Sequence, residues 1–202
     1  SIRCSNMKTE QYSISLRIII NLCLILSRFS EFIVFNSYKG KEFHMRYGYK
    51  NKNLEVINNG IDVNRFKNNK KNRLAGRKKF KISKTAAVLL TAARVDPMKG
   101  YEVLFEAYRK IRKIRPDVSL IIVGKDTNKL NFQKGVIALG GNENIEQIYP
   151  IADIIVSPSI FGEGFSNVLA EGMASELIPI ATRVGDSELI LEGIGISVNC
   201  NN

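Results

Sequence analysis

Short apolar runs alternate with helical segments from Thr85 onward, and this alternation limits the possible folds more than any other feature. Strands joined through helices pair in parallel by right-handed crossovers. Runs that are apolar throughout are typical of strands buried on both faces of a sheet. The sequence therefore predicts an α/β fold, a Rossmann-like parallel sheet with helices on both faces. The expected strands are 86–92, 118–123, 135–139, 152–156, 177–181 and 195–198, and the expected helices are 100–115, 142–151, 166–175 and 185–192.

The stretch 157–172, which follows the apolar run 152–156, is the most informative about function. It passes through a loop with glycine and serine into a segment that can be helical. A strand that leads through such a loop into a helix N-terminus presents free backbone N–H groups at the carboxyl edge of the sheet, where phosphates bind. We therefore expect the backbone N–H groups of Ser166, Asn167 and Val168 to face the phosphates of a ligand.

Two carboxylates flank the expected helix start, Glu163 in the loop and Glu171 within the helix. Acidic groups beside a phosphate site would repel the ligand unless they bind hydroxyl groups instead. A nucleotide sugar carries both phosphates and sugar hydroxyls. The pair of glutamates therefore indicates a nucleotide-sugar ligand.

Arg94 and Lys99 come directly after the expected strand 86–92, at the same edge of the sheet. Two cations at this edge can neutralise a diphosphate, arginine as a bidentate fork and lysine as a compact charge. Because negative charge builds up on a departing diphosphate, such cations also stabilise the transition state. The alternative is an ordinary surface ion pair, for example between Arg94 and Asp96.

The spacing of Glu163 and Glu171, with seven residues between them, resembles the paired-glutamate signature of retaining glycosyltransferase family 4. These group 1 glycosyltransferases have the GT-B fold, in which two Rossmann-like domains face each other across a cleft. The resemblance extends from about Ser30 to Val198 and covers mainly the C-terminal, donor-binding domain. Three further segments match the family in order, namely 56–62, 93–100 and 179–185.

The resemblance implies a role for each candidate residue. Arg94 and Lys99 would assist departure of the diphosphate. Glu163 would bind the hydroxyls of the donor sugar, and Glu171 would accept hydrogen bonds from the ribose hydroxyls. The nucleotide base would lie near Leu139. The other expected donor contacts are Gly164, Phe165, Ser166, Asn167 and Val168. The family often has proline where this chain has serine at the helix start, a departure that keeps the backbone N–H available. The resemblance implies no cofactor, and without an Asp-x-Asp motif we expect no metal site.

The same resemblance implies two domains. Residues 1–62 are expected to be a remnant of the N-terminal acceptor domain with the interdomain linker. Residues 63–202 are expected to form the nucleotide-sugar-binding domain, without the closing C-terminal helices of the family. The implied reaction is retaining transfer of a hexosyl unit from a nucleotide-diphosphate sugar to a glycan or lipid-linked acceptor. Two alternatives stay open: a binding module that is not catalytically competent alone, and a sugar-nucleotide epimerase of GT-B fold.

The formal net charge of +11 indicates attraction to polyanions, to an anionic membrane surface or to phosphorylated substrates. Many of the basic residues lie in segment 63–84, which we expect to be a solvated helix face and linker, with docking to anionic lipid as the alternative. Nucleic acid is not an expected partner, because aromatic residues are not interleaved with these charges. The apolar run 18–26 is shorter than the about 20 residues that cross a bilayer. We expect a cytoplasmic protein, either free or in peripheral contact with the membrane.

The N-terminal part gives three structural expectations. Residues 1–9 carry no periodic pattern and are expected to be frayed. Residues 10–28 have a helical pattern that is apolar around much of the circumference, which implies burial against a partner. By the resemblance this is the last helix of the acceptor domain, and without that domain we expect an apolar face to be left exposed. His44, the only histidine, lies on a short polar helix and is expected to be exposed rather than catalytic.

Overall fold

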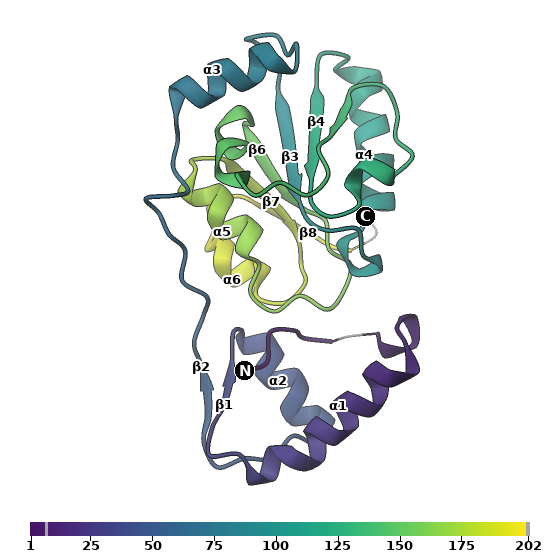
Figure 1. The fold of residues 1–202 in the computed structure, drawn as a ribbon, viewed down its shortest axis with the longest axis vertical. Helices are drawn as coiled ribbons and strands as arrows, with labels where there is room; N and C mark the ends of the chain where they lie inside the picture. The colour runs from purple at the N-terminus through teal and green to yellow at the C-terminus, as the bar shows by residue number, and fades with distance from the viewer. Residues whose placement is uncertain (7, 201–202) are drawn as a thin grey trace.

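The computed structural model describes residues 1–6 and 8–200, and the chain forms a larger and a smaller part (Figure 1). The larger part contains a six-stranded sheet flanked by helices. The smaller, N-terminal part contains a two-stranded sheet and two helices. An extended linker that follows β2 (Leu54–Val56) connects the two parts at the side of the molecule.

The six-stranded sheet has the order β5-β4-β3-β6-β7-β8, and every neighbouring pair is parallel. The predicted α/β fold is confirmed. The direction in which successive strands are added reverses between β3 and β6. Strands β4 and β5 lie on one side of β3, and β6, β7 and β8 lie on its other side. The strands are β3 (Val88–Ala92), β4 (Ser119–Val123), β5 (Val136–Ala138), β6 (Ile154–Ser157), β7 (Ile178–Thr182) and β8 (Ile196–Val198).

Helices cover both faces of the sheet, as the sequence predicts. Helix α4 (Tyr101–Ile114) packs Leu104 and Tyr108 against Leu89 and Leu120. A second core cluster fills the opposite face. Its fully buried aliphatic side chains each contribute about 1.5–3 kcal/mol relative to exposure. The helices of the larger part other than α4 are α3 (Lys70–Lys79), α5 (Asn167–Ala174) and α6 (Ser187–Leu191).

The predicted helix at 142–151 is wrong. Two short 3₁₀ helices, η5 (Ile145–Gln147) and η6 (Tyr149–Ile151), take its place. Pro150 lies at the start of η6 and has no N–H group to donate, so an α-helix cannot continue through it. The other 3₁₀ helices are η1 (Thr9–Gln11), η2 (Ser27–Phe29), η3 (Pro97–Lys99) and η4 (Thr127–Lys129).

The N-terminal part holds α1 (Ile14–Leu26), α2 (Tyr38–Tyr47) and the strand β1 (Ile33–Phe35), which pairs in parallel with β2. The expectation that residues 1–9 are frayed is wrong for the first residues. Ile2 bridges to Phe35, and Cys4 bridges to Glu163 of the larger part. Backbone pairing, which needs no side-chain pattern, fixes this segment.

Helix α1 presents its apolar side chains to solvent. Every one of its residues is exposed or only partly buried, which agrees with the apolar face expected to be left exposed without the acceptor domain. The exposed apolar residues of α1 are Ile14, Ile18, Ile19, Leu22, Ile25 and Leu26. None of the helices in the described residues is both long and apolar enough to cross a membrane.

Two expectations about polar side chains are wrong. His44 is buried beside the rings of Phe35 and Tyr49, and its Nδ1 lies 2.8 Å from the carbonyl oxygen of Gly40. Arg77, counted within a solvated helix face, is also buried. Its guanidinium pairs with Asp153 at 2.8 Å and donates to several backbone carbonyls, which compensates for the loss of water.

Candidate functional site

The candidate site lies where the strand order reverses. Arg94 and Lys99 follow β3, and Glu163 follows β6, so the topology brings them to the carboxyl edges of two adjacent parallel strands. In open α/β sheets, ligands bind at this switch point. The two loops are tied together directly, because the backbone N–H of Ile160 donates to the carbonyl oxygen of Met98 at 2.8 Å.

Gly100 allows these two loops to approach closely. It has a left-handed backbone with a φ of 62°, and a Cβ atom there would lie 2.1 Å from the carbonyl oxygen of Pro158. Only glycine avoids that clash and adopts this conformation freely. The glycine after Lys99 is therefore what sets the lysine against the loop that carries Glu163.

Glu163 is held by two side chains. Its Oε1 atom accepts a hydrogen bond from the Lys99 ammonium and another from the Ser159 hydroxyl at 2.6 Å. The side chains of Lys99 and Glu163 are only 16% and 11% exposed. The structure thus brings together two residues that the sequence predicted separately, and Ser159, which the sequence analysis missed, fixes the carboxylate with them.

Arg94 remains accessible. Its side chain is 58% exposed, and its guanidinium pairs with Asp96 at 2.8 Å, so the contact considered as the alternative does form. The Asp96 side chain is 11% exposed and has other hydrogen-bond donors, so it does not depend on Arg94 alone. The exposed guanidinium of Arg94 is thus available to a ligand at the edge of the sheet.

Asp96 connects the Arg94 loop to the N-terminal part. Its carboxylate accepts hydrogen bonds from the Tyr12 hydroxyl at 2.9 Å and from the Met98 backbone N–H at 3.1 Å. Burial pushes the pKa of Asp96 upward, but these hydrogen bonds and the one from Arg94 outweigh it, and the pKa is lowered. Burial and the contact with Asp96 raise the pKa of Tyr12 to about 12. Asp96 thus stays ionised and Tyr12 stays protonated near neutral pH.

Glu171 lies on α5, and a buried tyrosine orients it. The Tyr149 hydroxyl donates a hydrogen bond of 2.5 Å to Oε2 of Glu171. Burial raises the pKa of Glu171, although the hydrogen bond from Tyr149 and the charge of Arg65 act in the opposite direction. Tyr149 and Arg65 are functional candidates that the sequence analysis missed, because neither forms a local motif with Glu171.

The start of α5 combines a buried N-cap with an exposed first helical residue, Asn167. Ser166 is the N-cap and is buried, and within the described residues its side chain makes no capping hydrogen bond to α5. The next residue, Asn167, accepts a hydrogen bond from the linker residue Asn59 at 2.7 Å. Val168, partly buried, packs against the core. The first N–H groups of a helix carry a partial positive charge, so this helix start can receive an anion.

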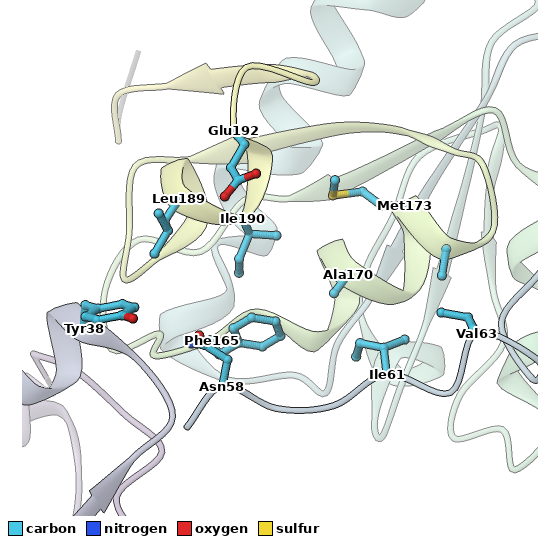
Figure 2. Close-up of a pocket in the computed structure, with 11 residues that line it drawn as sticks. Tyr38, Asn58, Ile61, Val63, Phe165, Ala170, Met173, Leu189, Ile190 and Glu192 are labelled. Atoms are coloured by element: carbon cyan, nitrogen blue, oxygen red, sulfur yellow. The ribbon is translucent and has the colours of Figure 1, made fainter. Parts of the chain in front are cut away.

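The remaining predicted residues lie at the borders of the site. Gly164 is enclosed, since a Cβ atom on it would lie 2.5 Å from Oδ1 of Asn36. Leu139 follows β5 and is partly buried against the core. A cavity of about 690 Å³ lies between the linker, α5 and α6. Figure 2 shows the Phe165 ring among the residues that line it, with Ile61 and Ile190 nearby. The Phe165 side chain therefore lies in an apolar environment.

Residues 86–202, more than half of the chain, match the protein family described as Glycosyl transferases group 1. The chain belongs to the group 1 glycosyltransferases. Its Rossmann-like sheet matches solved glycosyltransferases of the GT-B type.

Two curated glycosyltransferases are similar to the chain over part of their length. The chain is 30% identical over 160 residues to the lipopolysaccharide 1,2-N-acetylglucosaminetransferase of Salmonella typhimurium. This match covers 70% of this chain and 42% of that protein. It is 33% identical over 134 residues to the phosphatidyl-myo-inositol mannosyltransferase of Mycobacterium tuberculosis, covering 62% of this chain and 34% of that protein. The chain thus spans less than half the length of these relatives.

Solved structures agree with this membership. The Anabaena protein HepE in complex with UDP-glucose superposes with a TM-score of 0.80 at 24% identity, over 96% of this chain and 56% of HepE. A glycosyltransferase from Rickettsia africae superposes with a TM-score of 0.72 at 25% identity, over 95% of this chain and 54% of that one. The HepE likeness shows the fold, and the superposition includes the N-terminal part as well as the sheet.

Proposed function

We propose that this group 1 glycosyltransferase chain binds a nucleotide-diphosphate sugar and takes part in retaining transfer of a hexosyl unit to a glycan or lipid-linked acceptor. The observation that carries the proposal is the Lys99–Glu163 pair at the switch point of the sheet, with Arg94 accessible beside it. A carboxylate for sugar hydroxyls and cations for a diphosphate lie on adjoining loops. HepE, which shares the fold, was solved with UDP-glucose.

In the proposed complex, each charged group has one task. Arg94 exchanges Asp96 for the diphosphate, and Lys99 shares its charge between the diphosphate and Glu163. Both cations stabilise the charge that develops when the sugar–phosphate bond breaks. Glu163 accepts hydrogen bonds from the sugar hydroxyls, and Glu171 accepts them from the ribose. The departing phosphate oxygen takes the proton of the incoming hydroxyl on the same face of the sugar, so no nucleophile of the protein is needed.

Backbone groups complete the proposed donor site. The N–H groups of Ser166, Asn167 and Val168 receive the phosphates at the start of α5. The backbone next to Leu139 borders the base, and Gly164 and Phe165 shape the loop between the two glutamates. Residues 63–202 form the donor-binding domain in this proposal, and residues 1–62 belong to the acceptor side and the linker.

We propose the class of acceptor from the relatives and the location from the net charge. The Salmonella relative is named for lipopolysaccharide, a glycolipid, and the mycobacterial one for phosphatidyl-myo-inositol, a phospholipid. We place this chain's reaction in the cytoplasm, where the net charge of +11 favours peripheral contact with an anionic membrane surface.

A transfer assay tests the proposal. The chain is incubated with UDP-, GDP- or ADP-linked hexoses and an acceptor extract, and the anomeric configuration of the product is read by NMR. Glu163→Gln should abolish transfer, while Glu55→Gln, at an exposed carboxylate on β2, should leave it unchanged. An inverted product would refute retention. Formation of an epimer of the free nucleotide sugar would favour an epimerase instead.

A further inference from the structure

Asp186 is the N-cap residue of α6, but its side chain caps another helix. Within the described residues its side chain makes no capping hydrogen bond to α6. The carboxylate instead accepts from the first two backbone N–H groups of α2, at 2.7 Å from Tyr38 to Oδ2 and at 2.9 Å from Lys39 to Oδ1. The residue is only 2% exposed. A buried carboxylate of the larger part therefore binds a helix start in the N-terminal part.

These two hydrogen bonds complete the N-terminus of α2. The third N–H group, that of Gly40, donates to the side chain of Ser37 at 3.0 Å. The first N–H groups of a helix have no partners within it and carry a partial positive charge, so a carboxylate is the most favourable partner there. In Figure 2, Tyr38 lies on the side of the apolar cavity where Leu189 of α6 also lies. The N-terminus of α2 is therefore hydrogen-bonded to the N-cap residue of α6.

The backbone around Asp186 contacts the loop of the candidate site. Its N–H donates to the carbonyl oxygen of Gly164 at 3.1 Å. The preceding Gly185 has a φ of 58°, and a Cβ atom on it would lie 2.5 Å from the carbonyl oxygens of both Glu163 and Gly164. Asn36, two residues before the start of α2, also lies close to Gly164. The Glu163 loop is thus clamped between Asp186 and the N-terminal part.

We propose that Asp186 is a positioning residue that sets Glu163 for the donor sugar by latching the site loop to α2. This inference rests on the proposed function, because it assigns Glu163 to the sugar. Asp186 does not touch the ligand and acts through the backbone of Gly164. Loss of the latch should therefore weaken recognition of the sugar and spare recognition of the nucleotide, which depends on Glu171 and α5.

The test measures the affinities of UDP and UDP-glucose by calorimetry, or of the guanosine or adenosine counterparts if these bind more tightly. Asp186→Asn keeps the shape of the side chain but replaces one acceptor oxygen by a donor that faces an N–H group. We expect it to weaken UDP-glucose about tenfold and to change UDP less than about twofold. Amide hydrogen exchange at Tyr38 and Lys39 should become faster. Asp186→Ala should act in the same direction.

Ser37→Ala is the matched control, because it removes a cap from the same helix end without breaking the link to Gly164. It should lower the melting temperature and leave the ratio of the two affinities unchanged. If Asp186→Asn also leaves that ratio unchanged, Asp186 is only a helix cap, and the inference is overturned while the donor site stands. If the folded wild-type chain binds none of the nucleotides, the proposed function fails and the inference falls with it. If Asp186→Ala unfolds the chain, the ratio of the two affinities in Asp186→Asn decides whether Asp186 is a positioning residue.

Discussion

The hydroxyl group of Tyr149 donates a 2.5 Å hydrogen bond to the carboxylate of Glu171. Tyr149 is fully buried, and Phe66 packs against its ring edge-to-face. The carboxylate that we assign to the ribose is thus oriented by a group in the core. A small substitution in the core at Tyr149 should therefore change the affinity for the ligand.

Tyr149→Phe keeps the ring and removes only this hydrogen bond. Glu171 then loses its fixed orientation, and a hydrogen bond to a charged group contributes about 1.5–3 kcal/mol. We expect nucleotide affinity to fall about tenfold with little change in secondary structure. Calorimetric titration with UDP, GDP and ADP measures the affinity, and circular dichroism checks the fold. The same substitution at Tyr108, a buried tyrosine on α4 that bonds backbone carbonyls, is the control and should leave affinity unchanged.

Nucleotide affinity should also depend on pH through Glu171. Burial raises the pKa of this carboxyl above its ordinary value, and the ionised form is the stronger acceptor for two ribose hydroxyls. Affinity should therefore decline as the pH falls toward the raised pKa. Because the Tyr149 hydrogen bond acts to lower this pKa, Tyr149→Phe should move the decline to higher pH. Titrations between pH 5 and 8 measure it, and a decline that persists in Glu171→Gln would contradict this cause.

The buried histidine predicts a pH dependence of stability. Burial lowers the pKa of His44, so the folded chain keeps it neutral while the unfolded chain protonates it below about 6.5. The stabilisation is complete above that pH and is lost as the pH falls below it. We expect the free energy of unfolding to drop by about 1 kcal/mol between pH 7.5 and pH 5.5. Urea unfolding of wild type and His44→Leu measures this, and an equal drop in both would refute the assignment.

Arg77 should be a stability residue despite its place in a basic segment. Its removal leaves several backbone carbonyls without a donor and takes one of two arginine partners from the partly buried Asp153. We expect Arg77→Ala to lower the free energy of unfolding by about 3 kcal/mol. Lys78→Ala, next to it on the exposed face of α3, should change it by less than about 0.5 kcal/mol. Similar small effects for both would show that Arg77 behaves as a surface residue.

The fold was predictable because its signal is local. Each apolar run and each helical segment carries its own periodic pattern, and parallel pairing follows from their alternation. The Lys99–Glu163 pair was within reach for the same reason, since both residues follow strands that the pattern identifies. The 142–151 region was mispredicted where Pro150 interrupts an otherwise helical stretch.

Contacts between distant segments could not be predicted. Tyr149 meets Glu171, and Asp186 meets the start of α2 over 148 and 147 positions of sequence, through geometry that no local spacing encodes. Burial of His44 and Arg77 was missed because single polar residues are assigned to the surface by default. Their neighbours in space, aromatic rings in one case and carbonyl oxygens in the other, appear only in the folded chain.

Calorimetric titration of the purified, folded chain with UDP, GDP and ADP tests the donor site most directly, together with Arg94→Ala and Glu171→Ala. Arg115→Ala is the control, because Arg115 forms an exposed pair with Asp117 at the same two-residue spacing as Arg94 with Asp96. We predict saturable binding of one nucleotide, weakened by both site variants and unchanged by the control. The absence of binding to all three nucleotides, or equal effects of Arg94→Ala and Arg115→Ala, would contradict the assignment.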